Sequence, residues 1–156
     1  MSAEVGSQTM SLLVADDLED EAIVLEYRSR RADVKPLFVL VVPEDPTRPR
    51  LVMTFGDMTV TRFRELLAHA SSQNVVESVG GIDSDDEMSF YLHDSSDPTR
   101  RPGLEWRGES GNALVTVWQP FGQGDPELWI RVWQEAPPRA VEKMVEEART
   151  CLTTRS

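Results

Sequence analysis

Hydrophobic residues alternate with polar ones along most of the chain, which predicts β-strands. Residues 22–28 place Ile23, Leu25 and Tyr27 on one side, as a half-buried strand does. Residues 37–42 are continuously apolar and β-branched, which indicates a central strand. By these criteria we expect strands at 22–28, 37–42, 50–55, around 88–92, 104–107, 113–118 and 127–133.

Two segments repeat hydrophobic residues at helical spacing instead. The first is expected at about 59–72, where Asp57 or Thr59 is available as the N-cap. The second is expected at about 137–152, because Pro137 and Pro138 suit the first turn of a helix. Their apolar stripes are Val60, Phe63, Leu66, Leu67 and Ala70 in the first, and Val141, Met144, Val145, Ala148 and Leu152 in the second.

This order of elements predicts an α+β fold, with a single, mostly antiparallel sheet of about six to eight strands and both helices packed on one face. The two strand-to-helix junctions resemble each other. We attribute this to the periodicity that any amphipathic helices share, with an ancient duplication as the alternative. The expected core includes Phe63, Leu66, Phe90, Ile130, Met144 and Val145.

The 156 residues suit one domain, 1–156, with residues 1–10 expected to be disordered. The acidic residues 16–21 are expected to form a solvated turn. The single cysteine, Cys151, leaves no partner for an internal disulfide and favours a reducing, cytoplasmic location. The net charge of −11 argues against nucleic-acid and anionic-membrane partners and permits a basic protein partner.

The residues that most often carry chemistry are few and scattered. His69 lies on the expected first helix, and His93 precedes Asp94 and two serines without the spatial relay that a catalytic triad needs. The acidic run 83–87 lacks the glycine of a calcium loop, and Cys151 has no histidine at zinc-ligand spacing. We therefore expect no catalytic residues, no metal site and no cofactor.

The tryptophans are the most informative feature. In the strand 127–133, Leu128, Ile130 and Val132 are the natural core set, so Trp129, Arg131 and Trp133 should line the opposite face. Trp118 and Trp106, on the preceding hairpin, are expected to extend this patch. Aromatic residues with arginine are enriched at binding hot spots. The alternative is that the face is covered by another segment or carries only a cross-strand aromatic ladder.

These observations favour a non-enzymatic module that binds a protein partner through the aromatic sheet face, helped by an acidic surface. Immunity proteins and secretion chaperones are small acidic proteins of this general kind. Two alternatives stay open. One is a small-molecule-binding or hydrolytic domain with a pocket between sheet and helices, and the other is a self-assembling homodimer subunit.

Overall fold

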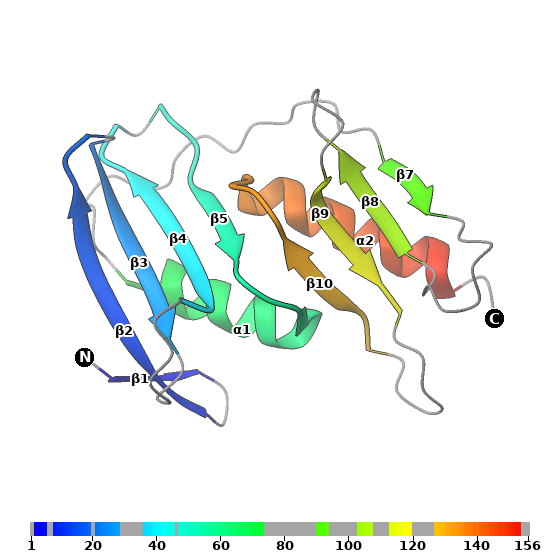
Figure 1. The fold of residues 1–156 in the computed structure, drawn as a ribbon, viewed down its shortest axis with the longest axis horizontal. Helices are drawn as coiled ribbons and strands as arrows, with labels where there is room; N and C mark the ends of the chain where they lie inside the picture. The colour runs from blue at the N-terminus through cyan, green and yellow to red at the C-terminus, as the bar shows by residue number, and fades with distance from the viewer. Residues whose placement is uncertain are drawn as a thin grey trace.

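The computed structural model describes residues 2–5, 8–19, 21–28, 36–45, 47–73, 90–93, 103–107, 113–119 and 127–153, with side chains except at 2–3, 8, 90–93 and 151–153. Within these ranges the chain forms ten strands and two helices (Figure 1). They are β1 (Ser2–Val5), β2 (Gln8–Asp17), β3 (Ala22–Arg28), β4 (Phe38–Pro43), β5 (Leu51–Thr54), β6 (Met58–Thr59), α1 (Val60–Ser71), β7 (Phe90–His93), β8 (Gly103–Arg107), β9 (Ala113–Trp118), β10 (Trp129–Val132) and α2 (Pro138–Thr153).

The strands form two five-stranded antiparallel sheets, in the orders β1-β2-β3-β4-β5 and β6-β10-β9-β8-β7. The α+β class and the antiparallel pairing are therefore as expected, whereas the single sheet of six to eight strands is not what the structure shows. The two sheets meet at one isolated bridge between Val52 and Ala136, whose backbone hydrogen bonds are 2.8 and 3.0 Å long. The side chain of Thr54 adds to this seam by bonding to Val132.

The amino-terminal segment was expected to be disordered, and this expectation is wrong for the residues that are described. β1 pairs with the first part of β2, and Val5 and Met10 are almost completely buried. The acidic Asp16 and Asp17 continue β2 rather than forming a turn, and the chain reverses at 18–21, where Glu21 has a φ of 48°. The first strands therefore close the outer edge of the first sheet.

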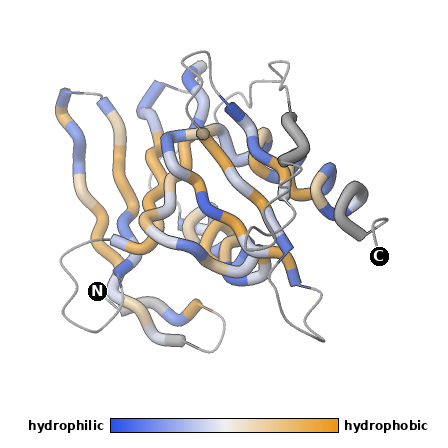
Figure 2. The backbone as a smooth tube through the Cα atoms, turned by 45° about the vertical axis from the view of Figure 1, so that its right-hand side comes forward, coloured by the Kyte–Doolittle hydropathy of each residue, from blue (hydrophilic) through white to orange (hydrophobic). Residues whose placement is uncertain are grey.

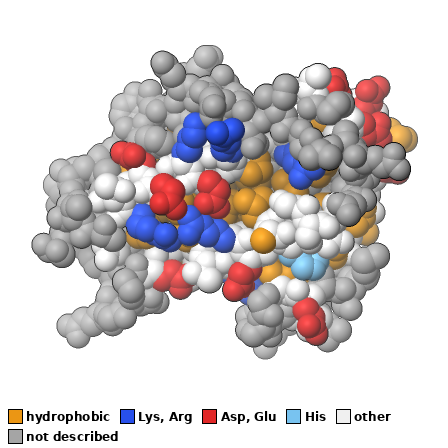
Figure 3. Space-filling model, turned by 180° about the vertical axis from the view of Figure 1, so that it is seen from behind, with side chains coloured by type: hydrophobic (Ala, Val, Ile, Leu, Met, Phe, Trp, Pro, Cys, Tyr) orange, Lys and Arg blue, Asp and Glu red, His pale blue; other side chains and the backbone are white. Residues whose placement is uncertain are grey.

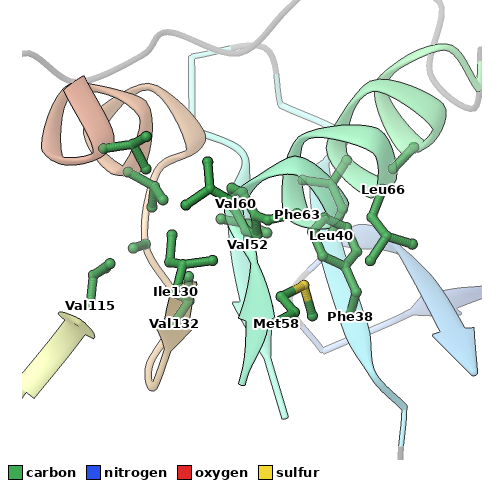
Figure 4. Packing of buried hydrophobic residues seen from close by; sticks show 14 of the residues in the cluster. Phe38, Leu40, Val52, Met58, Val60, Phe63, Leu66, Val115, Ile130 and Val132 are labelled. Carbon is green, nitrogen blue, oxygen red and sulfur yellow. The ribbon is translucent and has the colours of Figure 1, made fainter. Parts of the chain in front are cut away.

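Both helices form where their hydrophobic spacing predicts, and both lie behind the sheets in Figure 1. α1 is capped by Thr59, whose hydroxyl accepts a hydrogen bond from the Arg62 amide at 3.2 Å. Their apolar stripes pack onto the inner faces of the strands (Figure 4). Five of the six expected core residues are completely buried, and the side chain of the sixth, Phe90, lies outside the described residues.

Hydrophobic residues run along most strands of both sheets, with hydrophilic residues between them and in the turns (Figure 2). On the helix side, acidic and basic side chains lie side by side (Figure 3). Arg64 of α1 bonds there to Glu142 at 3.1 Å and to Glu146 at 2.8 Å, both on α2. These ion pairs are partly exposed, so each contributes little to stability on its own.

The two halves of the chain repeat one arrangement, β2-β3-β4-β5-α1 and β7-β8-β9-β10-α2. The strand registers agree along whole rows of the sheets. The row Leu13, Glu26, Val39, Met53 corresponds to the row Tyr91, Glu105, Thr116, Arg131. Shared helical periodicity does not account for matching strand registers, so the resemblance between the two junctions extends to the whole fold.

The repeat also organises the seam, through contacts between residues 78 positions apart. Thr54 bonds to Val132, and Arg64 bonds to Glu142, each across this separation. The seam bridges are reciprocal: Met58 pairs with Ile130, and Val52 pairs with Ala136. The halves are thus related by an approximate twofold axis that runs between β5 and β10. A short sequence signal accompanies it, because Leu-Glu-Tyr-Arg at 25–28 matches Leu-Glu-Trp-Arg at 104–107.

Candidate functional site

The sheet face that points away from α1 and α2 is the candidate site, and we call it the open face. No described helix lies on it (Figure 1). Side chains alternate between the two faces of a sheet. In β4, β5 and β10 every second residue is buried against the helices, so the residues between these lie on the open face. Its members are Leu13, Ala15, Val24, Glu26, Arg28, Val39, Val41, Leu51, Met53, Phe55, Glu105, Arg107, Thr116, Trp118, Trp129, Arg131 and Trp133.

The β10 side of the open face carries the predicted tryptophan and arginine cluster. The guanidinium carbon of Arg131 lies 3.8 Å from the centre of the Trp133 ring, which is a cation–π contact. The indole nitrogen of Trp133 donates a hydrogen bond to the Thr116 hydroxyl at 3.0 Å. Arg131 also faces Asp57 at 3.6 Å. Trp133 is therefore held in one orientation although 43% of its surface is exposed.

Trp118 joins this cluster and Trp106 does not. Trp118 lies directly opposite Trp129 in the register and opposite Gly103 on its other side. A Cβ at Gly103 would lie 2.8 Å from the Val117 carbonyl oxygen and 3.0 Å from the Trp118 Cβ, so glycine is what lets β8 approach β9 this closely beside Trp118. Trp106 is paired with the buried Val115 and packs against the core, on the helix side of the sheet.

The other half of the open face is apolar, and the sequence interpretation overlooked it. Val39 and Val41 of β4 and Leu51 and Met53 of β5 all point outward and are partly exposed. The signal was present, because a strand that is apolar at every position has two apolar faces. The sequence analysis interprets residues 37–42 only as a central strand, and in the structure α1 covers one of its two faces.

The repeat places Phe55 and Trp133 at equivalent positions, one after each of the two seam strands. Phe55 is 42% exposed, nearly the same as Trp133. The backbone contacts are repeated too. The Phe55 amide donates to the Leu37 carbonyl at 3.1 Å, and the Trp133 amide donates to the Leu114 carbonyl at 2.7 Å. The open face therefore presents two exposed aromatic side chains related by the approximate twofold axis.

Six charged side chains on or beside the open face form three close pairs of opposite sign, and Asp17, two residues after Ala15 on β2, adds an acidic group to the same face. Arg28 lies 2.9 Å from Glu26, and the equivalent residues of the second half, Arg107 and Glu105, are also 2.9 Å apart. The third pair is Arg131 with Asp57. The charges of these three pairs cancel, whereas the whole chain carries a net charge of −11.

His69, the histidine on α1, contacts a buried tyrosine. Its Nδ1 lies 2.6 Å from the Tyr27 hydroxyl, and the two rings meet edge to face at 5.5 Å. Tyr27 has no exposed surface, so this contact satisfies a hydroxyl group that water does not reach. The geometry gives His69 a structural role on the inner side of the first sheet, away from the open face.

Burial raises the pKa of Tyr27 to about 12. Since the unfolded phenol has a pKa near 10, the folded state favours the neutral form. This contribution to stability is complete below about pH 10 and is lost as the pH rises towards 12.

We expect absorbance at 295 nm to show a tyrosine that titrates close to pH 12 in the folded protein and near 10 in urea. Tyr27→Phe should remove that late step. If the step persists in the variant, Tyr27 is not its source.

Several predicted features lie outside the described residues: the side chains of His93 and Cys151 and the acidic run 83–87. In the part of the chain that is described, no group of three or more potential ligands could hold a metal ion. No helix in that part is both long and apolar enough to cross a membrane. Comparison with protein-family models, curated proteins and solved structures finds no match to this chain.

Proposed function

We propose that this chain is a non-enzymatic protein-interaction module that binds a protein partner through the open face. The observation that carries the proposal is the pair of exposed aromatic residues, Phe55 and Trp133, on a sheet face that no described helix covers. Isolated exposed apolar residues are common on any protein, but here they belong to one continuous face with Trp118 and Trp129.

The composition of the open face supports binding to a protein. Tryptophan and arginine are the residues most enriched at interface hot spots. Arg131 and Trp133 already hold each other in position, so little side-chain freedom is lost when a partner covers them. The aliphatic half, which includes Val39, Val41 and Met53, offers partly exposed apolar surface that a partner of complementary shape can cover.

An acidic corner borders the open face and forms part of the proposal. It consists of the exposed residues Asp16, Glu19, Glu21, Glu44 and Asp45, which lie around the β2–β3 turn and the end of β4. The Glu44 amide donates to the Glu21 carbonyl at 2.9 Å, which keeps these two segments together. Such a corner attracts basic groups on a partner and speeds association at low salt.

The interior gives less support to a pocket between sheets and helices. The described side chains there form one buried cluster, in which Phe63, Ile130 and Met144 have no exposed surface (Figure 4). We therefore place the proposed binding surface outside, on the open face.

The proposal predicts that Phe55→Ala/Trp133→Ala weakens partner binding and leaves folding intact. Truncating an anchor residue in an interface typically costs about 2 kcal/mol or more of binding, about 30-fold in Kd. Since both side chains are about two-fifths exposed in the monomer, the melting temperature should change little. The measurement is co-purification from the native host, followed by titration of the purified partner into both forms.

Glu65→Ala is the matched control, because Glu65 is exposed on α1, on the helix side of the sheets and away from both the open face and the acidic corner. This variant should bind as wild type does. Equal binding by wild type and the double variant would contradict the proposal. A large drop in the melting temperature of the double variant would contradict it too, because the aromatic residues would then be core.

A further inference from the structure

The charge of the open face restricts what can cover it. Its three arginines each lie beside an acidic side chain, so these pairs cancel in charge, and Asp17, two residues after Ala15 on β2, adds one acidic group. A partner selected by charge would therefore bind elsewhere, at the acidic corner. A partner of the open face itself must be apolar and neutral over an area of matching size.

The area is sufficient for a stable complex. Eight strands, β2–β5 and β7–β10, contribute to the face. Strands spaced about 4.8 Å apart and about five residues long span roughly 650 Å² of sheet plane, before side-chain relief is added. Stable interfaces bury roughly 800 Å² of accessible surface on each partner, so the open face is of the standard size.

A second copy of the chain meets both requirements. Its open face is mainly apolar, carries most of its described charges as close pairs of opposite sign and has an equal area. Stacked sheets pack about 10 Å apart with their facing side chains interdigitated. The acidic corners do not oppose this arrangement. Each lies at one corner of the face, so a twofold axis along or across the strands brings the two corners to different places in the dimer.

We infer that the partner of the open face is a second copy of this chain, bound face to face in a twofold dimer. The inference rests on the proposed function and names its partner. The open face, with its apolar residues and paired charges, is then the part of an acidic chain on which two copies meet with the least like-charge repulsion. The aromatic residues Phe55 and Trp133 of each copy pack against the open face of the other.

Sedimentation equilibrium tests the inference. Wild type should have about twice the 17.6 kDa mass of one chain. Trp133→Asp and Phe55→Asp should each raise the dimer dissociation constant by at least about 30-fold, because each places an uncompensated charge in a neutral interface. Because Phe55 and Trp133 occupy equivalent positions in the repeat, the two variants should raise the dissociation constant by similar factors. Leu18→Asp adds the same charge outside the open face and should leave the mass unchanged. Circular dichroism at matched concentrations shows whether each variant is folded.

The outcomes separate the inference from the proposed function. A wild-type mass of 17.6 kDa at every concentration overturns the dimer. The proposed interaction module would then be supported only if the wild type captures a different protein and Phe55→Ala/Trp133→Ala does not. A dimer that survives both aspartate variants places the interface elsewhere and also overturns the inference. If one variant fails to fold, the other still decides, since each alone introduces a charge into the face.

Discussion

Replacing Phe63 with alanine should lower the free energy of unfolding by about 3–5 kcal/mol, the largest effect that we expect from one substitution. Phe63 has no exposed surface and lies on the inner side of α1 (Figure 4). Its ring meets that of Phe38 at a centroid distance of 5.7 Å, and Phe38 in turn contacts Tyr27 at 5.8 Å. Alanine would leave a cavity that this aromatic cluster is too rigid to fill.

Urea denaturation at neutral pH measures the effect, and the chain supplies its own control. Phe55→Ala removes the same ring from a position that is 42% exposed in the monomer. Its cost in a monomeric sample should be well below that of Phe63→Ala. Similar losses for the two variants would mean that Phe55 is buried or that α1 does not rest on the sheet as described.

Replacing Thr54 with valine should cost about 1–3 kcal/mol, although the two side chains have nearly the same shape. Thr54 is buried, and its hydroxyl accepts a hydrogen bond from the Val132 amide at 2.9 Å. Valine would leave that amide without an acceptor in a place from which water is excluded. The lost hydrogen bond is one of the few that join the two sheets. Among the described residues, β5 makes backbone hydrogen bonds to the second sheet only at the Val52–Ala136 bridge.

Thr54→Ser keeps the hydroxyl and removes one methyl group, so it separates the hydrogen bond from packing. We expect the serine variant to retain more stability than the valine variant. Thermal unfolding followed at two wavelengths shows whether the halves still melt together. If valine is tolerated as well as serine, the hydroxyl contributes nothing to the seam.

The helices and most strand positions followed from the sequence because local periodicity decides them. α1 begins at Val60 and α2 at Pro138, one residue from the expected starts, since the caps and the apolar stripes mark these ends clearly. β1 and all of β2 were missed, because no strand was expected before residue 22. Small polar residues and Asp16-Asp17 have weak strand preference, and pairing with neighbouring strands outweighs it.

Of the candidate site, the tryptophan and arginine half could be predicted from the sequence, and the apolar half could not. Alternation correctly separated Trp129, Arg131 and Trp133 from the core residues of the same strand. The same rule, applied to residues 104–107, puts Trp106 on the side of the buried Leu104, where the structure has it. The apolar half of the open face did not follow, because composition alone does not tell whether one or both faces of β4 are covered.

The seam has a consequence for how the chain reaches this structure inside a cell. When the first half leaves the ribosome, the residues that pair with Val52 and Met58 in the folded protein have not yet been made. These are Ala136 and Ile130. These partners follow 84 and 72 residues later in the chain. Until then the nascent chain displays the unpaired edge of β5 beside the apolar β4, and such edges promote aggregation. Ribosome-associated chaperones are therefore expected to engage this chain between the emergence of residues 37–54 and that of β10.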